Sequence, residues 1–514
     1  MASFNMADCF ETVVDAVPER EALVAGDRRL TYAELDARAN RLAHWLADQG
    51  VGPDDHVGIH AYNCTEWMET FIACFKLRAA SINVNFRYTD DELRYLFADA
   101  DLKVVVHGPE FSPPFDGPML EIGDAYEKAI AGHSPGRAGP VGERSDDDHY
   151  VIYTGGTTGY PKGVIWRHED AFFAVFGGGN YAGEPVESRE ELAEKVAATP
   201  GLTYLITPPL MHGAGQWVTF GAGFLQGAKV VLYDGATFNP EYAWDLVERE
   251  KVQSITIVGD AIGRPLADAL AAHPGRWDVS ALVVVGSGGA PLSPTVKEQL
   301  GALLPNCFIL DSFGASETGY QGRASEGRRF TVGPECTVLS DAHEPVVPGS
   351  GEVGMLAQAG RIPLGYYKDE EKTAKTFIHA MGKRWSLPGD MATIEEDGSI
   401  TLLGRGSQCI NSGGEKIYPE EVEDALKSHP AVFDALVAGA PDERWGETVS
   451  AVVQLRSGSS VTLAQLQEHC RQTLAGYKLP RRLYLVDQVS RQPSGKPDYP
   501  WARELVKARE PDEA

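Results

Sequence analysis

The chain has 514 residues, which at roughly 150 residues per domain suggests about three domains or subdomains. It carries 46 Lys and Arg against 73 Asp and Glu, a net charge of −27. Such a surface repels phosphate backbones, so nucleic acid is not expected as a partner. If so acidic a protein binds a smaller polyanion, it must place a few cations where that anion sits.

The cysteines and the apolar runs indicate in which cellular compartment the protein works. The seven cysteines are dispersed and show no CxxC spacing, which favours a reducing cytosol over a disulfide framework or a zinc site. The N-terminus lacks a basic region followed by an apolar stretch, and no apolar run approaches the roughly 18–20 residues of a membrane span. We therefore expect a cytoplasmic protein without an integral membrane segment. Peripheral membrane contact stays open, and a homodimer is compatible with the sequence.

The first part of the chain alternates helices and strands. Thr31 and Glu34 form a capping-box pattern, the apolar residues that follow have helical spacing, and Gly50 ends the helix. Strands are predicted at 57–60, 80–84 and 104–106, with helices at 65–78 and from Thr89. This alternation predicts a parallel sheet.

The rest of the chain changes character twice. Residues 131–148 predict an exposed connection, and a second α/β series follows with strands at 229–233, 254–258, 282–286 and 307–311. Residues 330–400 are rich in Gly and Pro and predict short strands. From Pro419 a helix, strands 435–440 and 448–455 and a helix 462–475 predict a compact α+β domain, and the tail after Arg509 is expected to fray.

The predicted fold class is therefore α/β. A large N-terminal domain, residues 1–404, combines two doubly wound sheet subdomains with a small β-rich subdomain. A small α+β domain, residues 405–514, follows it.

A glycine-rich loop follows the predicted strand 149–153. Its sequence, residues 154–163, is Thr-Gly-Gly-Thr-Thr-Gly-Tyr-Pro-Lys-Gly. Glycines let backbone N–H groups approach an anion, the threonines add hydroxyl donors, and Lys162 adds a positive charge. Lys162 lies between Pro161 and Gly163, so this is not a Walker loop, which requires Gly-Lys-Ser/Thr. The alternative is a flexible surface loop.

The loop and six further segments, in order, resemble the adenylate-forming superfamily, which includes acyl-CoA and aryl-CoA synthetases, firefly luciferase and the adenylation domains of peptide synthetases. The resemblance covers essentially the whole chain. The segments are the loop above and the sequences Pro208-Pro-Leu-Met-His-Gly213, Gly286-Ser-Gly-Gly-Ala-Pro291, Asp311-Ser-Phe-Gly-Ala-Ser-Glu-Thr318, Pro388-Gly-Asp390 with Gly404-Arg405, and Pro493-Ser-Gly-Lys496.

The resemblance implies an ATP site and its residues. Phe313 would stack on adenine, Asp390 and Arg405 would contact the ribose, and Glu317 would help to hold Mg²⁺. The remaining ATP-binding residues that it implies are Thr154, Gly155, Gly156, Thr157, Thr158, Lys162, Gly289, Ala290, Asp311, Ser312, Gly314, Ser316 and Lys496.

The resemblance also implies the catalytic groups. Lys496 would bridge the substrate carboxylate and the α-phosphate, and His212 would lie beside the acyl carboxylate, so Lys496, His212 and Thr157 are the candidate catalytic residues. His212, Gly213 and Trp217 would line the acyl pocket. The alternatives are a solvated surface lysine and a satisfied core histidine.

The second half reaction would form a thioester with coenzyme A. In the superfamily the C-terminal domain is mobile, swings about a hinge and opens a pantetheine tunnel. Ser412, Gly413 and Gly414 match the tunnel segment, although an ordinary glycine turn is the alternative.

Two departures from the superfamily pattern point to a subfamily. Pro388 replaces the usual Thr before Gly-Asp, and Ser407 replaces Asp or Lys at the hinge. Actinobacterial steroid side-chain CoA ligases share both traits, and the sequences 83–88, 163–170, 404–416 and 475–480 support this closer resemblance. It implies a bulky acid, with steroid side-chain acids first and medium- or long-chain fatty acids second. Residues 178–200 lie either near the pocket mouth or in a solvated insertion.

Two other functions compete with an ATP-dependent carboxylic acid:CoA ligase. One is an acyl-AMP ligase that hands its product to a carrier protein or another acceptor, or a luciferase-like enzyme. The other is a binding module that holds ATP or AMP without catalysis. The intact charged residues Lys162, Glu317 and Lys496 argue against the binding module.

Overall fold

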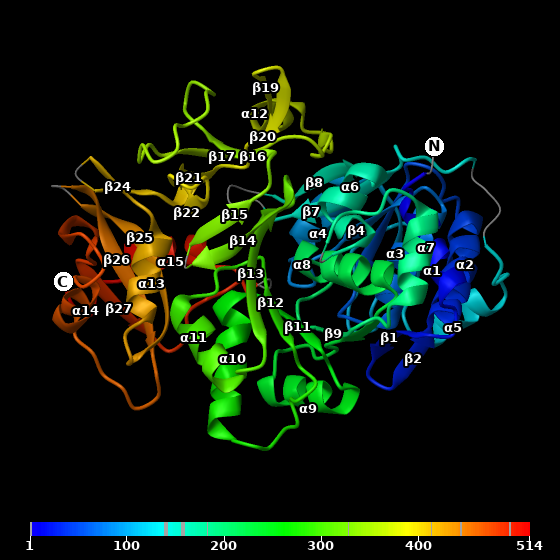
Figure 1. The fold of residues 1–514 in the computed structure, drawn as a ribbon, viewed down its shortest axis with the longest axis horizontal. Coiled ribbons are helices and arrows are strands. Elements are labelled where there is room, and N and C mark those ends of the chain that lie inside the picture. Colours follow the sequence, from blue (N-terminus) through cyan, green and yellow to red (C-terminus); the bar gives the residue numbers. More distant parts are fainter. Residues whose placement is uncertain are drawn as a thin grey trace.

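A computed structural model describes residues 3–137, 142–155, 160–181, 183–326, 328–412, 414–442, 445–492 and 495–514. It has a large N-terminal domain and a small C-terminal domain, and it confirms the predicted α/β class. Figure 1 shows the C-terminal elements gathered at one end and the first elements of the chain at the other. The middle of the chain lies between them.

A parallel four-stranded sheet comes first, in the order β4-β3-β5-β6. Capping boxes at Thr31 and Thr89 start helices α2 and α4, as predicted. The elements are β3 (His56–His60), β4 (Ala80–Asn83), β5 (Leu102–His107), β6 (Met119–Glu121), α2 (Tyr32–Asp48), α3 (Thr65–Lys76), α4 (Asp90–Asp99) and α5 (Asp124–Ala131).

The second sheet runs from parallel to antiparallel pairing without a break. Strand β13 pairs with β12 in parallel up to Asp311, and then with β14 in antiparallel fashion from Ser312. The sequence predicted a small β-rich subdomain, and one 15-stranded sheet joins it to the parallel part. The parallel part and its helices are β1 (Glu21–Ala25), β9 (Thr203–Ile206), β10 (Lys229–Leu232), β11 (Ser254–Ile257), β12 (Val284–Ser287), β13 (Phe308–Ala315), α9 (Pro240–Glu250), α10 (Gly259–Ala272) and α11 (Pro294–Leu303), with β2 (Arg28–Thr31) at the edge.

Antiparallel strands make up the remainder of that sheet, as the composition of 330–400 predicts. They are β14 (Gly319–Glu326), β15 (Arg329–Val332), β16 (Cys336–Leu339), β17 (Gly354–Gln358), β19 (Phe377–Ala380), β20 (Lys383–Ser386), β21 (Asp390–Ile394) and β22 (Ile400–Arg405), with α12 (Glu370–Thr376). A third sheet has the order β18-β8-β7, from β7 (His149–Thr154), β8 (Lys162–Arg167) and β18 (Gly365–Tyr366). Helix α6 (His168–Ala174) follows β8 along the chain.

The C-terminal domain has its own core. Strands β25 and β26 form a long antiparallel pair, against which Leu426 and Leu466 are buried. The elements are β23 (Ile410–Ser412), β24 (Glu415–Ile417), α13 (Pro419–Lys427), β25 (Val432–Asp442), β26 (Gly446–Leu455), α14 (Leu463–Cys470), β27 (Arg482–Val486) and α15 (Tyr499–Ala508). The tail does not fray: the Leu483 N–H donates to the Glu513 carbonyl at 2.8 Å, because an edge of β27 is open to it.

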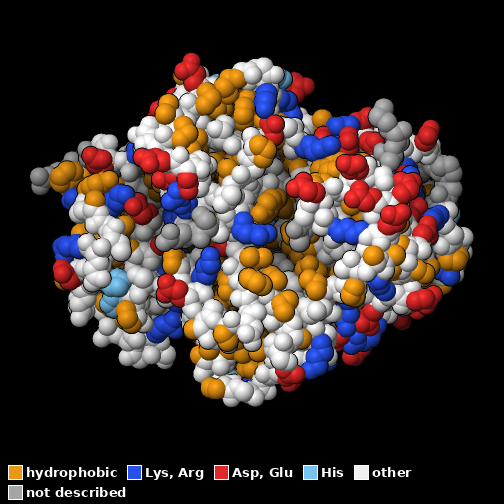
Figure 2. Space-filling view, in the orientation of Figure 1, with side chains coloured by type: hydrophobic (Ala, Val, Ile, Leu, Met, Phe, Trp, Pro, Cys, Tyr) orange, Lys and Arg blue, Asp and Glu red, His pale blue; other side chains and the backbone are white. Residues whose placement is uncertain are grey.

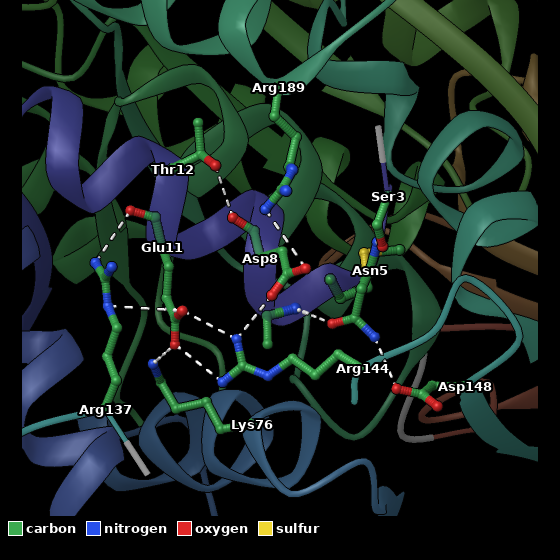
Figure 3. Close-up of polar contacts among 12 residues, drawn as sticks. Ser3, Asn5, Asp8, Glu11, Thr12, Lys76, Arg137, Arg144, Asp148 and Arg189 are labelled. Carbon is green, nitrogen blue, oxygen red and sulfur yellow. Dashed lines mark hydrogen bonds and ion pairs between the residues drawn. The ribbon is translucent and has the colours of Figure 1, made fainter. Parts of the chain in front are cut away.

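The N-terminal helix α1 (Met6–Ala16) is fixed by a charged network, shown in Figure 3. The fully buried Lys76 ammonium lies 2.6 Å from Glu11 Oε1 and 2.6 Å from Asp36 Oδ1. Arg144 reaches Glu11 Oε2 at 2.9 Å. These three contacts tie α1 to α2, α3 and the connection before β7. We call Glu11, Asp36, Lys76 and Arg144 the anchor network.

Residues 178–200 pack onto the same helix. They contain α7 (Arg189–Ala198), whose Leu192 and Val196 are buried. Arg189 lies 3.4 Å from Asp8 of α1, and Arg20 donates to the Val196 carbonyl at 2.9 Å. The segment is therefore more than a solvated insertion. No helix in the described part of the chain is long and apolar enough to cross a membrane.

Candidate active site

The base of the glycine-rich loop is held by two antiparallel strands. Thr154 at the end of β7 is the register partner of Lys162 at the start of β8. Lys162 Nζ lies 3.0 Å from Asp369 Oδ2, and this hydrogen bond raises the pKa of Lys162. Gly155 is exposed, and no atom of the described residues other than its chain neighbours lies within 4 Å of where a Cβ would lie. The predicted residues Gly156, Thr157 and Thr158 lie outside the described residues.

The predicted adenine side follows strands β12 and β13. Gly289 has φ +86°, and a Cβ there would lie 3.7 Å from Ala214 Cβ, so the turn with Ala290 passes close to the start of α8 (Gly213–Trp217). Phe313 contacts Phe330 with ring centroids 4.5 Å apart. Burial raises the pKa of Asp311 to about 7.

The hairpin between β13 and β14 is tightly closed. A Cβ at Gly314 would lie 2.2 Å from the Gly319 carbonyl oxygen, so only glycine fits there. Ser312 pairs with Arg323 across the hairpin, and the Trp166 indole donates to the Ser316 carbonyl at 3.0 Å. The hairpin thereby fixes the backbone on both sides of Phe313.

The predicted metal carboxylate lies at the turn of this hairpin. The Tyr366 hydroxyl donates to Glu317 Oε1 at 2.8 Å, and the Ser386 hydroxyl donates to the Glu317 carbonyl at 2.6 Å. Lys372 Nζ lies 4.1 Å from the Tyr366 ring centroid, and burial lowers its pKa. These contacts orient the Glu317 carboxylate.

The predicted ribose residues face each other on β21 and β22. Asp390 and Arg405 are register partners, and Arg405 Nε lies 2.7 Å from Asp390 Oδ1. Burial raises the pKa of Asp390 although Arg405 opposes the rise. Arg405 also donates to the Pro388 carbonyl at 2.9 Å. Proline can take part in this contact because it uses the carbonyl oxygen and not the N–H group that proline lacks.

The C-terminal lysine reaches this site. Gly495 packs so closely that a Cβ there would lie 3.0 Å from Ala261 Cβ of α10. Burial lowers the pKa of Lys496, as does Arg405, while Glu317 and Asp390 oppose the change. The structure therefore brings Lys496 within electrostatic range of Glu317 and Asp390 of the N-terminal domain and of Arg405 at the domain boundary. The sequence did not predict which domain orientation would be found.

His212 also lies within electrostatic range of Lys496. Burial lowers the pKa of His212 to about 3, and the charge of Lys496 contributes to this lowering. Its Nε2 atom is buried and has no hydrogen-bond partner within the described ranges.

The predicted acyl-pocket residues follow His212. Helix α8 (Gly213–Trp217) runs into a π-helix, Val218–Gly223. The Trp217 indole donates to the Tyr150 hydroxyl at 3.1 Å, and a Cβ at Gly213 would lie 3.1 Å from the Trp217 ring. These contacts fix the Trp217 ring beside Gly213. The π-helix was not predicted, because no simple residue pattern announces one.

The predicted pantetheine segment is a hairpin of the C-terminal domain. Ser412 is buried and pairs with Gly446 of β26. Gly414 has φ +92°, as a tight turn between β23 and β24 requires, and no described atom other than those of its chain neighbours lies within 4 Å of where its Cβ would be. Gly413 lies outside the described residues.

Three site residues were missed by sequence reasoning: Tyr366, Asp369 and Lys372. Tyr366 contacts Glu317 and Asp369 contacts Lys162, from a segment two hundred residues after the loop, and no residue pattern there signals a ligand. Antiparallel pairing of β18 with β8 brings the segment to the site.

The surface has a depression beside strands β14 and β15, near the predicted adenine side. It has a volume of about 340 Å³, and its lining includes Tyr320 and Arg323. Figure 2 shows hydrophobic side chains gathered in a hollow near the middle of the drawn face, over the area of β14 and α8. A larger depression of about 630 Å³ is lined by Phe97, Phe115 and their neighbours and shares no residue with the predicted site.

Comparison with known proteins decides the family. Residues 10–366 match the AMP-binding enzyme family, and residues 421–496 match the AMP-binding enzyme C-terminal domain. The chain belongs to the AMP-binding enzyme family. Both matched regions contribute to the site, since Lys496 is the last residue of the second.

Two relatives and one structure illustrate the similarity. The chain is 47% identical to a 3-oxocholest-4-en-26-oate–CoA ligase of Rhodococcus rhodochrous, over 99% of this chain and 97% of the relative. It is 46% identical to a medium/long-chain-fatty-acid–CoA/3-oxocholest-4-en-26-oate–CoA ligase of Mycolicibacterium smegmatis, over 99% and 98%. The anthranilate CoA ligase AuaEII, solved with anthranoyl-AMP, has the same fold, with a TM-score of 0.86 at 22% identity over 99% and 98%.

Proposed function

We propose that this enzyme is an ATP-dependent carboxylic acid:CoA ligase that forms an acyl-adenylate and then an acyl-CoA thioester. The observation that carries the proposal is that Lys496 of the C-terminal domain lies within electrostatic range of Glu317, Asp390 and Arg405. The two relatives from Rhodococcus and Mycolicibacterium are CoA ligases that match this chain over nearly their full length, which supports CoA as the acceptor. Neither is named as a ligase that uses a carrier protein.

The proposed ATP site uses the predicted residues. The loop residues Thr154, Gly155, Gly156, Thr157, Thr158 and Lys162 hold the phosphates. Gly289, Ala290, Asp311, Ser312, Phe313, Gly314 and Ser316 surround adenine. Asp390 and Arg405 hold the ribose, which requires Asp390 to be ionised, and the adjacent Arg405 favours that state.

Glu317 fits a magnesium site. Mg²⁺ usually takes one or two carboxylates and completes its shell with phosphate oxygens and water. The described residues contain no group of three or more side chains that would form a protein cage, and Glu317 offers one oriented carboxylate. When bound, Mg²⁺ would neutralise phosphate charge.

The residues then act in two steps. The substrate carboxylate attacks the α-phosphorus and displaces pyrophosphate, and Lys496 offsets the negative charge that accumulates. His212 stays neutral at pH 7 because its pKa is far below, so it can face the acyl carboxylate without adding charge. Next the thiol of CoA attacks the acyl carbon, its proton is lost, and AMP leaves.

The second step needs the other domain orientation. We place the boundary at residues 404 and 405, with Ser407 in the hinge. Gly404 has φ +140°, and a Cβ there would lie 2.3 Å from Glu420 Oε2, so substitution at this joint would clash with α13. Rotation would remove Lys496 and present Ser412, Gly413 and Gly414 to the pantetheine arm.

For the acid, we propose a bulky hydrophobic molecule. Steroid side-chain acids come first, and medium- or long-chain fatty acids come second, in keeping with the names of the two relatives. His212, Gly213 and Trp217 would line the start of its pocket. We propose that the enzyme is cytoplasmic.

An acid panel tests the proposal. Purified protein with ATP, Mg²⁺ and CoA is offered 3-oxo steroid side-chain acids, fatty acids of graded length and aromatic acids, and products are identified by mass spectrometry. The expected products are AMP and the acyl-CoA of the bulky acids. Adenylate without thioester would favour the carrier-protein alternative, and the absence of acid-dependent pyrophosphate release with every acid would refute the ligase.

A further inference from the structure

A buried ion pair joins the two domains. Lys427, the last residue of α13, places Nζ 3.5 Å from Asp260 Oδ2 in the first turn of α10, and both side chains are only 4% exposed. The Ser293 N–H donates to Asp260 Oδ1 at 2.8 Å, so the carboxylate is fixed within the N-terminal domain. Lys427 therefore reaches across the interface to a prepared partner.

The loop that carries Lys496 docks on the same turn of α10. Gly495 has φ +76°, and a Cβ there would lie 3.0 Å from Ala261 Cβ and 3.2 Å from Val258 Cγ1. Ala261 directly follows Asp260. Any movement of the C-terminal domain away from α10 would therefore break both the ion pair and the contact of the Lys496 loop.

The charges make this contact dependent on orientation. Burial disfavours the charge of Lys427, but the carboxylates of Asp260, Asp424 and Glu423 outweigh it and raise the pKa of Lys427. If Lys427 were absent, the carboxylates of Asp260, Asp424 and Glu423 would lose their shared cation in the docked arrangement, and burying their negative charge would cost free energy. Domain separation would expose the interface to water and remove that penalty.

Asp260 also has a partner within its own domain. Arg264 Nη2 lies 3.7 Å from Asp260 Oδ2 in the same helix. Asp260 therefore keeps one cation when Lys427 leaves. This arrangement suits a contact that must open and close.

A weaker contact lies beside the pair. Arg456 Nη1 lies 3.3 Å from Asp268 Oδ2, with both side chains about one-third exposed. Arg264 and Arg456 also flank the Phe433 ring, at 5.9 and 5.8 Å from its centroid. These contacts extend the interface along α10.

We propose that Asp260 and Lys427, the interdomain pair, position Lys496 by holding the C-terminal domain in the orientation for adenylation. This inference rests on the proposed function, because it assumes that Lys496 serves the first half reaction. Asp260 and Lys427 are positioning residues, since they act through the domain contact. The second half reaction, which uses the other orientation, should not need them.

Lys427→Met tests the division between the half reactions. Adenylation is measured as acid-dependent ATP–pyrophosphate exchange, and thioester formation is measured with synthetic acyl-AMP and CoA. We expect adenylation to fall about 10- to 100-fold and thioester formation to stay within about twofold or to rise. Lys507→Met, on the exposed face of α15, is the control and should change neither. Equal loss of both half reactions, or loss of neither, would overturn the inference.

A double-mutant cycle tests the pairing itself. Asp260→Asn keeps an oxygen for the Ser293 N–H but removes the charge. The double variant with Lys427→Met should lose little more adenylation than the worse single variant, because residues in one ion pair are coupled. Additive losses would show that Asp260 and Lys427 act independently and would contradict the pair.

Hydrogen exchange gives a readout that needs no activity. In Lys427→Met, amides in peptides covering 258–266 should exchange faster than in the wild type, because the docked orientation is less populated. Unchanged exchange would overturn the inference even if adenylation fell. Loss of every activity in the wild type would instead refute the proposed function.

Discussion

Two buried lysines in this enzyme are paired in different ways. Lys76 in the anchor network makes hydrogen bonds of 2.6 Å to both Glu11 and Asp36 within one domain. Lys427 joins two domains, and its nearest carboxylate oxygens are 3.5 and 3.8 Å away. Short charge-assisted hydrogen bonds suit a permanent contact, whereas a longer ion pair can be broken at lower cost. The contrast separates residues that hold the fold from residues that select a domain orientation.

Removing the permanent lysine should have the largest effect on stability. Lys76→Met leaves Glu11 and Asp36 without their shared ammonium group, and we expect a loss of about 3–5 kcal/mol in the free energy of unfolding. Urea denaturation measures it. Lys375→Met removes an exposed lysine that pairs with Glu371 and should change little. A Lys76→Met protein as stable as wild type would break the comparison.

Removing Lys496, which we propose to be catalytic, should affect one half reaction. Lys496→Ala should reduce acid-dependent pyrophosphate exchange about 100- to 1000-fold, because the charge that offsets the developing negative charge is lost. Thioester formation from supplied acyl-AMP should remain within about twofold. Stability should not fall as it does for Lys76→Met. Equal losses in the two half reactions would contradict the assignment of Lys496 to adenylation.

The anchor network should also govern acid stability. Burial opposes the charge of Glu11, but the Arg144 hydrogen bond and the Lys76 ammonium lower its pKa from 4.5 to about 2. The ionised form is therefore favoured by folding, so this stabilisation is present above pH 4.5 and is lost as pH falls toward 2. A shift of this size corresponds to about 3 kcal/mol.

Denaturation curves between pH 6 and pH 2.5 measure this loss. Glu11→Gln should make the free energy of unfolding less dependent on pH in that window. It should also lower the free energy of unfolding at neutral pH. If Glu11→Gln keeps the full slope of unfolding free energy against pH, that slope comes from other carboxylates.

The smallest effect is expected at the edge of the interface. Arg456 and Asp268 are about one-third exposed, so water screens their contact. Arg456→Met should reduce adenylation less than about threefold and leave thioester formation unchanged. A loss as large as that of Lys427→Met would move the main domain contact from the interdomain pair to Arg456.

Short motifs in the sequence named residues that the structure brings together, but they did not name the residues that contact them. Asp390 and Arg405 were assigned from short motifs, and the structure places them face to face because adjacent strands pair in register. Tyr366 and Asp369 were missed because their role comes from pairing between β18 and β8, which links distant segments. The Asp260–Lys427 pair was invisible for the same reason, since no local pattern specifies a domain interface.

The fold shows the same division. Helices α2 and α4 begin where their capping boxes predict, because a capping box satisfies backbone donors within four residues. The continuity of the long sheet was not predicted, because β13 changes from parallel to antiparallel pairing within one strand. The tail was expected to fray from its composition, but the edge of β27 binds it.

One measurement tests the central claim most directly. The enzyme is given ATP, CoA and an acid whose carboxylate carries two ¹⁸O atoms, and AMP is analysed by mass spectrometry. Attack of the carboxylate on the α-phosphorus, followed by cleavage by CoA at the acyl carbon, leaves one ¹⁸O in AMP. We predict one label per AMP and none in pyrophosphate. Unlabelled AMP formed together with acyl-CoA would contradict an acyl-adenylate.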